Sequence, residues 1–425
     1  MANAPAEILI IENFLSISYM KWEIKRLNII TGDMAAGKSL CMKLLKFFED
    51  IIPNLLSSGY DCFCKNLNKD NYYKYLSDRF NNIFEFSFTD PFKEKHFNIT
   101  YTFSYNEEKF DMLVCGSNEK YINIKSTYIE KLLQECGKLL QKNENLTPDK
   151  PEDVKEDSLI EFKNTIYNGV LNKFGSLFPV STAFIPASRA ALAVSSDYSD
   201  YYLKKYAELF GILKTKQGKN EKKVNEILKA KIGMDEDLFL ESNDGRKVSI
   251  KKASSGQQEI IYVLMQLDRL GNNGYKYGKS LSLFIEEPSA HLFPLEQMLI
   301  INYIVNKYNE LKNTDKPVRF FITTHSPYIL NSLNNILRKG ALLKKYPNQT
   351  KEINNNEKIA ATPALSAEEE VSAYFIDNNG KGEDLFDPED RDFIYSKKIN
   401  DISFTIDEID EILSDLDDEL QEKKE

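Results

Sequence analysis

The sequence contains no apolar run close to the ~18 to 20 residues that a helix needs to span a membrane. Its first residues, MANAPAEILIIENF, lack the basic region and following apolar stretch that mark a secretory signal. Both absences argue against a membrane protein and against an exported one. We therefore expect a cytoplasmic protein with no membrane partner.

Cysteine and histidine are also scarce, with five Cys and three His among 425 residues. An odd number of cysteines does not suit a disulfide framework, and the C-x-C pair Cys62 and Cys64 has no second pair at metal-ligand spacing. We expect free thiols in a reducing compartment. With 42% hydrophobic and 28% charged residues, the chain is expected to be globular and to hold more than one domain.

Positive charge is in short supply, because 55 Lys and Arg face 65 Asp and Glu and give a formal net charge of −10. Proteins that grip DNA usually present a basic face, since neutralising phosphates supplies most of the non-specific affinity. The overall charge lowers the expectation of tight DNA binding without excluding it. The Lys-rich stretch 214–231 is either a solvated helix, which we favour, or a local binding surface.

Apolar spacing predicts an α/β fold with an antiparallel β subdomain and a helical insertion. The predicted elements are two or three strands in 7–30, a helix at 40–52, strands in 82–114, mainly helix in 120–217, core strands at 280–288 and 318–327, a helix at 295–312 between them, a hairpin at 373–386 and an acidic amphipathic helix at 404–425. No internal repeat is visible.

Residues 32–39, GDMAAGKS, fit G-x-x-x-x-G-K-[ST] in full and lie between an apolar strand and a helix. Such glycines permit a tight loop whose backbone N–H groups point at phosphate oxygens, and the helix N-terminus adds favourable potential. Lys38 is expected to reach the β- and γ-phosphates, and the Ser39 hydroxyl to coordinate Mg²⁺. The alternative, a chance Gly-Lys-Ser turn, does not explain the strand–loop–helix context. The expected nucleotide-binding residues of this loop are Gly32, Asp33, Met34, Ala35, Ala36, Gly37, Lys38, Ser39 and Leu40.

The predicted strand at 280–288 ends in two acids, Glu286 and Glu287. One carboxylate in such a position lies near Mg²⁺, here Glu286, and the second, Glu287, can orient or deprotonate the attacking water. Two acids after a strand could equally form a solvated turn, and the upstream P-loop favours the functional interpretation. His325 ends the next strand. A lone histidine is usually structural, but a neutral imidazole there could contact the γ-phosphate or the attacking water.

Ser254, Ser255, Gly256 and Gln257 precede a helix-like run. A Ser-Gly pair at a helix N-terminus can bind an anion through its hydroxyl and its free N–H groups. Taken alone, the segment is better explained as an ordinary helix N-cap. Its place between the P-loop and the acidic strand favours a part in nucleotide binding.

The order of these motifs, P-loop, S-S-G-Q, h-h-E-E-P and T-H-S, resembles the ABC-type P-loop NTPase head of RecF, the SMC proteins and the OLD-family ATPases. The resemblance implies ATP hydrolysis with Mg²⁺ in a homodimer that sandwiches ATP. Ser255 and Gly256 of one copy would face the P-loop of the other, with Glu287 as the catalytic carboxylate and His325 as the switch histidine. The implied division is an N-terminal ATPase lobe with the β subdomain (1–120), a helical insertion (121–235), a C-terminal ATPase lobe (236–345) and a tail of β-hairpin and acidic helix (346–425).

Three further segments narrow the resemblance to bacterial OLD-like ATPases of the AAA15 group, near the AriA ATPases of PARIS anti-phage systems and the PtuA ATPases of Septu. The segments are E-E-P-S-A-H-L-F-P, I-P-A-S-R-A around Arg189, and V-S-A-Y-F-I before the acidic helix. The chain lacks the long coiled coil of SMC proteins and the acidic Toprim cluster of full OLD nucleases. No Q-loop glutamine can be placed.

These features support one favoured function and two alternatives. The favoured function is an anti-phage sensor and scaffold, a dimer or higher-order ring that holds a separate Toprim- or HNH-type nuclease and releases it on a phage trigger. The first alternative is a RecF-like repair ATPase that clamps DNA. The second is a nucleotide-locked scaffold with negligible turnover, which stays open because Glu286 stands where most P-loop proteins have Asp.

Overall fold

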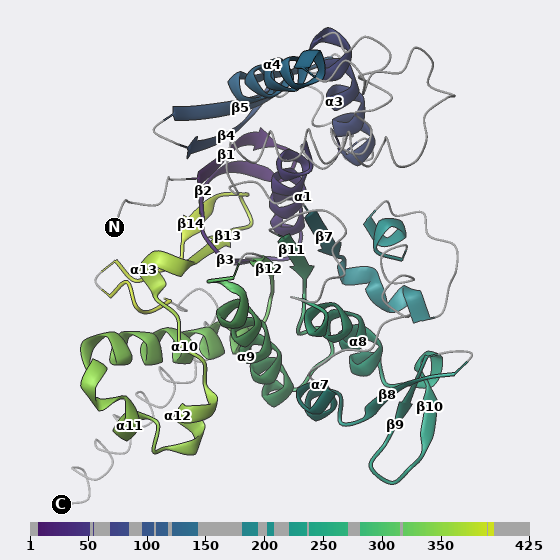
Figure 1. The fold of residues 1–425 in the computed structure, drawn as a ribbon, viewed down its shortest axis with the longest axis vertical. Helices are drawn as coiled ribbons and strands as arrows, with labels where there is room; N and C mark the ends of the chain where they lie inside the picture. The colour runs from purple at the N-terminus through teal and green to yellow at the C-terminus, as the bar shows by residue number, and fades with distance from the viewer. Residues whose placement is uncertain are drawn as a thin grey trace, which may run out of the picture.

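The computed structural model describes residues 7–51, 54, 69–84, 96–105, 108–117, 121–142, 181–193, 202–207, 221–235, 238–270, 281–314, 318–388 and 390–394. Cys62, Cys64 and the predicted acidic helix at 404–425 lie outside these residues. The described elements form a six-stranded core sheet with helices on both faces, a five-stranded antiparallel sheet with its own helices, and a small third sheet (Figure 1). The predicted α/β class is confirmed.

The core sheet has the strand order β14-β13-β3-β12-β11-β7. Its strands are β3 (Leu27–Gly32), β7 (Ser181–Ile185), β11 (Leu281–Glu286), β12 (Val318–Thr323), β13 (Val371–Ile376) and β14 (Gly382–Asp384). All neighbouring pairs are parallel except β13 and β14. Strands β3, β11 and β13 are buried along their whole length, as expected where helices cover both faces. The carboxyl ends of β3, β12 and β11 therefore meet at one edge of the sheet.

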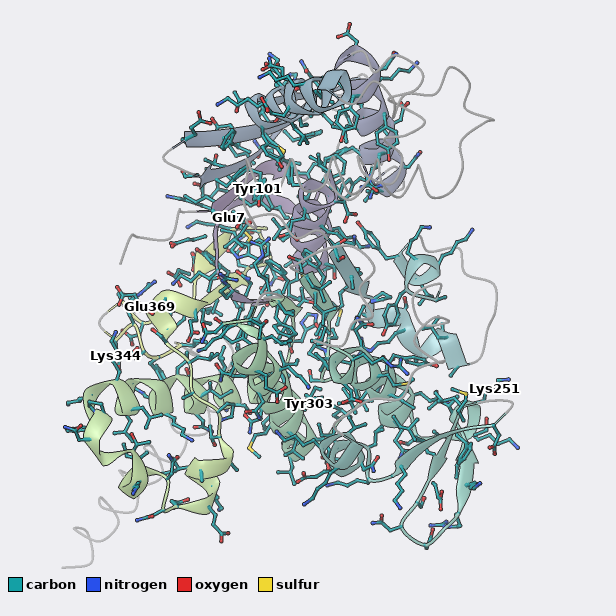
Figure 2. The ribbon with its side chains drawn as sticks, in the orientation of Figure 1. Glu7, Tyr101, Lys251, Tyr303, Lys344 and Glu369 are labelled. Atoms are coloured by element: carbon teal, nitrogen blue, oxygen red, sulfur yellow. The ribbon has the colours of Figure 1, made fainter. Side chains whose placement is uncertain are left out.

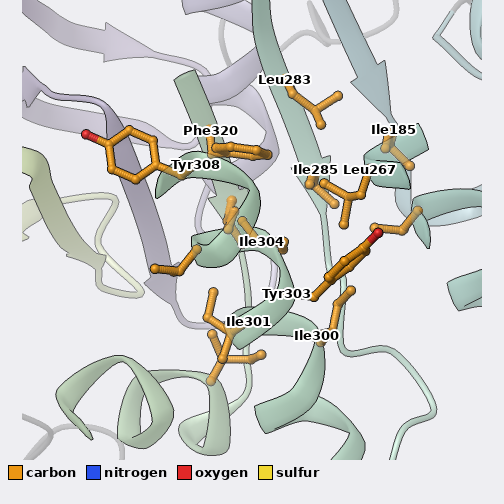
Figure 3. Packing of buried hydrophobic residues seen from close by; sticks show 14 of the residues in the cluster. Ile185, Leu267, Leu283, Ile285, Ile300, Ile301, Tyr303, Ile304, Tyr308 and Phe320 are labelled. Atoms are coloured by element: carbon orange, nitrogen blue, oxygen red, sulfur yellow. The ribbon is translucent and has the colours of Figure 1, made fainter. Parts of the chain in front are cut away.

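Alternate residues of the core strands pack into two separate apolar clusters. Leu283 and Ile285 of β11 join the cluster formed with α8, α9 and α10, part of which Figure 3 shows. Phe284, between them, packs in the cluster of α1. The period of two along a strand thus gives each layer of helices its own core. The covering helices are α1 (Lys38–Glu49), α8 (Ser255–Asp268), α9 (Pro294–Leu311) and α10 (Pro327–Lys345).

The predicted antiparallel subdomain is a sheet of order β2-β1-β4-β5-β6. Its elements are β1 (Glu7–Phe14), β2 (Ile17–Ile24), β4 (Phe97–Tyr105), β5 (Glu108–Ser117), β6 (Tyr121–Ser126), α3 (Lys69–Phe84) and α4 (Thr127–Lys142). The strand prediction was wrong at 82–84, which is helical. Phe80 and Phe84, four residues apart, lie on one face of α3, with ring centroids 5.7 and 5.4 Å from that of Phe14. The helix prediction was wrong at 121–126, which pairs with β5.

A buried charged group joins the two large sheets. Arg319 of β12 contacts the carboxylates of Glu7 in β1, at 2.6 Å, and of Glu49 in α1. The Tyr101 hydroxyl of β4 donates to the other Glu7 oxygen at 2.5 Å (Figure 2). Burial raises the pKa of Glu49 to about 7, and Arg319 acts in the opposite direction. Buried ion pairs such as those of Arg319 fix the position of one sheet relative to the other but add little net stability, because desolvation of the charges offsets most of their attraction.

The basic stretch 214–231 leads into the small third sheet. Its described part contains helix α7 (Glu221–Leu228), so the helix prediction is confirmed there, and Val224, Ile227 and Leu228 are buried in the core. The sheet that follows has the order β10-β9-β8, and Lys251 (Figure 2) lies just after it. Its strands are β8 (Lys231–Met234), β9 (Leu238–Glu241) and β10 (Lys247–Ser249), followed by the 3-10 turn η7 (Ile250–Lys252).

The last described segment adds two strands to the core sheet. β13 pairs with β3, and β13 and β14 form the predicted antiparallel hairpin. The short elements before it are η8 (Pro347–Gln349), α11 (Thr350–Ile353), α12 (Glu357–Ala361) and α13 (Ala367–Glu370). Among the described residues, no helix is both long enough and apolar enough to pass through a membrane.

Candidate active site

The loop after β3 has a backbone that few residue types tolerate. Gly32 and Gly37 have φ angles of 146° and 109°, and Ala35 has 60°. A Cβ atom on Gly32 would lie 2.1 Å from the carbonyl oxygen of Ile376 in β13, and one on Gly37 would lie 2.8 Å from the side chain of Ile17. Both glycines are therefore needed for the loop to close over β3 and open directly into α1.

Replacing Gly32 with alanine is expected to lower the free energy of unfolding by about 3 kcal/mol, because backbone strain and a backbone clash add together. The matched control is Gly245→Ala. Gly245 also has a positive φ, 82°, but a Cβ there meets no atom within 4 Å. Strain alone should cost about 1 kcal/mol at Gly245. Urea unfolding of both variants measures the difference, and equal losses would show that β13 does not constrain the loop.

Lys38, the first residue of α1, is 6% exposed and folds back over the loop. Its Nζ donates to the carbonyl oxygens of Gly32 at 3.1 Å and Asp33 at 2.7 Å, and lies 3.3 Å from Nδ1 of His325. Burial lowers the pKa of Lys38, while the Glu287 carboxylate raises it. The ammonium group is thus held where the loop, β12 and β11 converge.

Glu287 and His325 lie together beyond the ends of β11 and β12. Glu287 has a left-handed backbone, with φ of 44°, and its N–H donates to the Thr323 carbonyl oxygen at 2.9 Å. Its Oε2 accepts from the His325 backbone N–H at 3.2 Å, and its Oε1 lies 3.8 Å from Nε2 of His325. The fold therefore brings Lys38, Glu287 and His325 into one group.

The surroundings shift the pKa values of both groups. Burial raises the pKa of Glu287, an effect that the His325 N–H and the Lys38 ammonium oppose. Burial also lowers the pKa of His325, and Lys38 lowers it further. The lowered pKa favours the neutral imidazole, and the raised pKa gives the carboxylate a higher proton affinity than an ordinary glutamate.

Glu286, the last residue of β11, suits a metal ligand. It is 6% exposed, and its Oε2 accepts from the Ala187 backbone N–H at 2.9 Å. Its Oε1 and the hydroxyl of Thr323 are buried without a hydrogen-bond partner among the described residues. A buried carboxylate oxygen of this kind is costly unless a cation or water satisfies it, and Mg²⁺ prefers such hard oxygen donors. Ser39, half-buried in the first turn of α1, follows Lys38 directly.

The Ser254–Gln257 segment begins α8 and holds two serines in different roles. Ser254 is the N-cap, and its side chain forms a capping box with Gln257, as the plainer alternative predicted. Ser255 is exposed, and within the described residues its hydroxyl has no hydrogen-bond partner. Gly256 is buried, and a Cβ atom added there would lie 2.7 Å from the His291 carbonyl oxygen, so no larger residue fits without a shift.

The fold does not join this segment to the other predicted residues. Within the described part of the chain, no hydrogen bond or ion pair connects 254–257 with the loop 32–40, Glu287 or His325. Instead, the Gln257 side chain donates to the Leu228 carbonyl oxygen at 3.0 Å. Within one copy, the described contacts therefore do not bring this segment to the group of Lys38, Glu287 and His325.

Arg189 and Ala187 are site residues that motif reasoning missed. They lie in the 3-10 helix η6 (Ala187–Ala193), which follows β7, and β7 pairs with β11. Arg189 donates to the carbonyl oxygens of Glu286 at 2.6 Å and Glu287 at 2.8 Å. The available signal was the I-P-A-S-R-A segment after a short apolar run. Its nearness to the acids depends on the pairing of β7 with β11, which sequence spacing does not reveal.

The family comparison agrees with this geometry. Residues 192–330 match the AAA_15 family model, described as an AAA ATPase domain. The described fold is α/β, and the P-loop sequence lies between β3 and α1. The matched range contains Ser255, Glu286, Glu287 and His325, and the P-loop precedes it in the sequence.

Two solved structures illustrate what the fold resembles. The SMC head domain from Thermotoga maritima is 10% identical, with a TM-score of 0.34, and the match covers 77% of this chain and 92% of that one. A structure of the recombination mediator protein RecF in the RecFOR pathway is 13% identical, with a TM-score of 0.35, and the match covers 90% and 99%. None of the curated proteins matches this chain.

Proposed function

We propose that this chain hydrolyses ATP with Mg²⁺ at a site that is completed by a second copy of itself. The observation that carries the proposal is that two groups of predicted nucleotide-binding residues make no contact with each other within one copy. Lys38, Glu287 and His325 meet at one edge of the core sheet, whereas the exposed Ser255 hydroxyl contacts none of them. A helix N-terminus with a free hydroxyl binds anions, so Ser255 would contact the nucleotide held by the other copy.

In this site the chain's own residues divide the work. The loop amides and Lys38 hold the phosphates, and the Lys38 ammonium exchanges its carbonyl contacts for phosphate oxygens. Glu286 and Ser39 would hold Mg²⁺, which neutralises charge on the transferred phosphoryl group. Glu287 accepts a proton from the attacking water, and neutral His325 supplies a hydrogen bond near the γ-phosphate.

Mixing two inactive variants tests the composite site. Lys38→Ala disables the loop but keeps Ser255, and Ser255→Arg blocks the α8 half-site but keeps Lys38. Each alone should be inactive. Their mixture should recover up to about a quarter of the wild-type rate, because random pairing makes half the dimers mixed, each with one intact site.

The matched control mixes Lys38→Ala with Glu287→Gln. Both changes lie in the same half-site, so every mixed dimer still has two defective sites and the rate should stay at background. A mixture of Lys38→Ala and Ser255→Arg that neither hydrolyses ATP nor binds it more tightly than either variant alone would contradict a site shared between copies.

For biological role, we propose the anti-phage scaffold, in which the ATP-loaded dimer or ring holds a separate Toprim- or HNH-type nuclease until a phage trigger arrives. The resemblance of E-E-P-S-A-H-L-F-P and I-P-A-S-R-A to ATPases of such systems supports it.

The distribution of charge along the chain supports the alternative, a RecF-like ATPase that binds DNA. Residues 401–425 contain eleven Asp and Glu and two Lys, a net charge of −9, so the other 400 residues carry only −1. The acidic total therefore does not count against a DNA-binding surface elsewhere.

Affinity capture of the Glu287→Gln variant with ATP separates these roles. Recovery of a nuclease in stoichiometric amount, with no change in the ATP turnover of the wild-type protein on adding DNA, would support the scaffold. Recovery of DNA with repair proteins, together with wild-type ATP turnover stimulated by duplex, nicked or single-stranded DNA, would support the RecF-like role. Stimulation by DNA should weaken steeply as salt rises, since phosphate contacts release counterions.

A further inference from the structure

Arg189 is fully buried and holds the acidic end of β11 through its peptide groups. Its Nη1 donates to the carbonyl oxygens of Glu286 at 2.6 Å and Pro186 at 3.1 Å. Its Nη2 donates to the Glu287 carbonyl oxygen at 2.8 Å. One guanidinium group therefore fixes both peptide units that carry the two acids.

The same guanidinium group also reaches α8. Its Nε donates to the Glu259 carbonyl oxygen at 2.9 Å and lies 3.3 Å from the Glu259 carboxylate. Glu259 is four residues after Ser255, so it lies one turn further along the same helix. Gly256, in the first turn, packs directly against the His291 carbonyl of the loop that follows Glu287. The first turns of α8 therefore contact the end of β11 through Arg189 and the loop after β11 through Gly256.

The backbone of Glu287 depends on such support. A glutamate with φ of 44° is strained, and strained backbone persists only where its surroundings hold it. The Glu287 N–H is held by the Thr323 carbonyl oxygen, and the Glu287 carbonyl is held by Arg189. Of these two groups, Arg189 is the one that also contacts α8, through the Glu259 carbonyl oxygen.

We propose that Arg189 is a positioning residue that couples the first turns of α8 to Glu287. The inference rests on the proposed function, in which Ser255 contacts the nucleotide of the other copy while Glu287 serves the chain's own nucleotide. Engagement of α8 by the partner's nucleotide then sets the Glu287 backbone through Arg189. The two sites of the dimer consequently hydrolyse ATP together.

Arginine suits this coupling in a way that lysine cannot. The planar guanidinium group presents five N–H donors in a rigid fork, and here Nε faces α8 while the two Nη groups face the carbonyls around β11. A lysine keeps the charge but offers one rotatable ammonium group. Arg189→Lys should therefore keep the protein folded while breaking the link between the two elements.

The first measurement is ATP hydrolysis by Arg189→Lys over a range of ATP concentrations. We expect kcat to fall on the order of 100-fold, as for a misplaced catalytic group, with KM for ATP within about 3-fold of wild type. The Hill coefficient for ATP should fall from about 2, the limit set by the two sites of the dimer, to about 1. Arg246→Lys is the matched control, because Arg246 is exposed and pairs with Asp244 at the surface.

The second measurement is hydrogen exchange with a non-hydrolysable ATP analogue, which needs no turnover. In the wild type the analogue should slow exchange both in the first turn of α8 and at the backbone amides of Glu286 and Glu287. In Arg189→Lys the protection should remain at α8 and disappear at these two amides. Protection of both segments in the variant would overturn the coupling, even if the wild type proved unable to hydrolyse ATP, which would overturn the proposed function instead.

Glu259→Gln keeps the test decisive if Arg189→Lys does not fold. This change keeps the carbonyl that accepts from Nε and removes the carboxylate charge at 3.3 Å. We expect a smaller loss of kcat and of cooperativity than in Arg189→Lys, with ATP affinity retained. Wild-type kcat and Hill coefficient in Glu259→Gln, with full protection of the Glu286 and Glu287 amides, would overturn the proposal.

Discussion

Replacing Glu287 with glutamine is expected to lower kcat for ATP hydrolysis by about 10²- to 10⁴-fold while leaving ATP bound. The amide has nearly the same shape and can still accept the His325 backbone N–H, which now contacts Oε2 at 3.2 Å. It cannot take a proton from water. The bound nucleotide should therefore hold two copies together, which size-exclusion chromatography with Mg²⁺ and ATP will show as a stable dimer.

The pH dependence of hydrolysis gives an independent check. Burial raises the pKa of Glu287 above that of an ordinary glutamate. Only the carboxylate form can accept a proton, so the wild-type kcat should fall as pH falls through this raised pKa. The residual rate of Glu287→Gln should lack that acid limb. A wild-type profile without an acid limb would argue that another group activates the water.

Glu310→Gln is the matched control for this substitution. Glu310 lies on α9, is half exposed and pairs with Lys307 at 3.0 Å, away from the site. Its loss should leave kcat and the acid limb unchanged. Wild-type turnover in Glu287→Gln would show that the catalytic assignment is wrong, whatever Glu310→Gln does.

Replacing Lys38 with alanine should weaken ATP binding by about 100-fold or more. Two charge-assisted hydrogen bonds to phosphate, each worth about 1.5 to 3 kcal/mol, are lost together. The Lys38 ammonium is nearly buried and is already held by the carbonyl oxygens of the loop. Its side chain therefore loses little conformational freedom when it binds a phosphate. Titration of a fluorescent ATP analogue measures the change in Kd.

Lys43→Ala controls for the loss of a positive charge from α1. Lys43 lies farther along the same helix, and its Nζ stacks over the Tyr202 ring at 5.2 Å. ATP affinity in Lys43→Ala should match the wild type within about 2-fold. Equal weakening in both variants would mean that the helix's overall charge, and not the Lys38 contact, retains the nucleotide.

Local patterns determined the P-loop, the acidic strand end and the β13–β14 hairpin. The loop 32–39 is contiguous, and its glycines, lysine and serine act within a few residues of each other, so their spacing alone carries the chemistry. Glu286 and Glu287 end a wholly apolar strand for the same kind of reason. The Asn-Gly turn set the hairpin, because those residues favour the backbone that a tight turn needs.

Tertiary structure decided the features that depend on which distant segments meet. Strand order placed His325 beside Lys38, and the pairing of β7 with β11 put Arg189 behind the two acids, although about a hundred residues separate them. The structure also distinguishes the two adjacent serines. Ser254 caps α8, whereas the side chain of Ser255 is exposed. Sequence periodicity indicates which face of a helix or strand is buried. It does not indicate which other element packs against that face, because the partner can come from any part of the chain. The residue types were thus readable from the sequence, and their partners only from the fold.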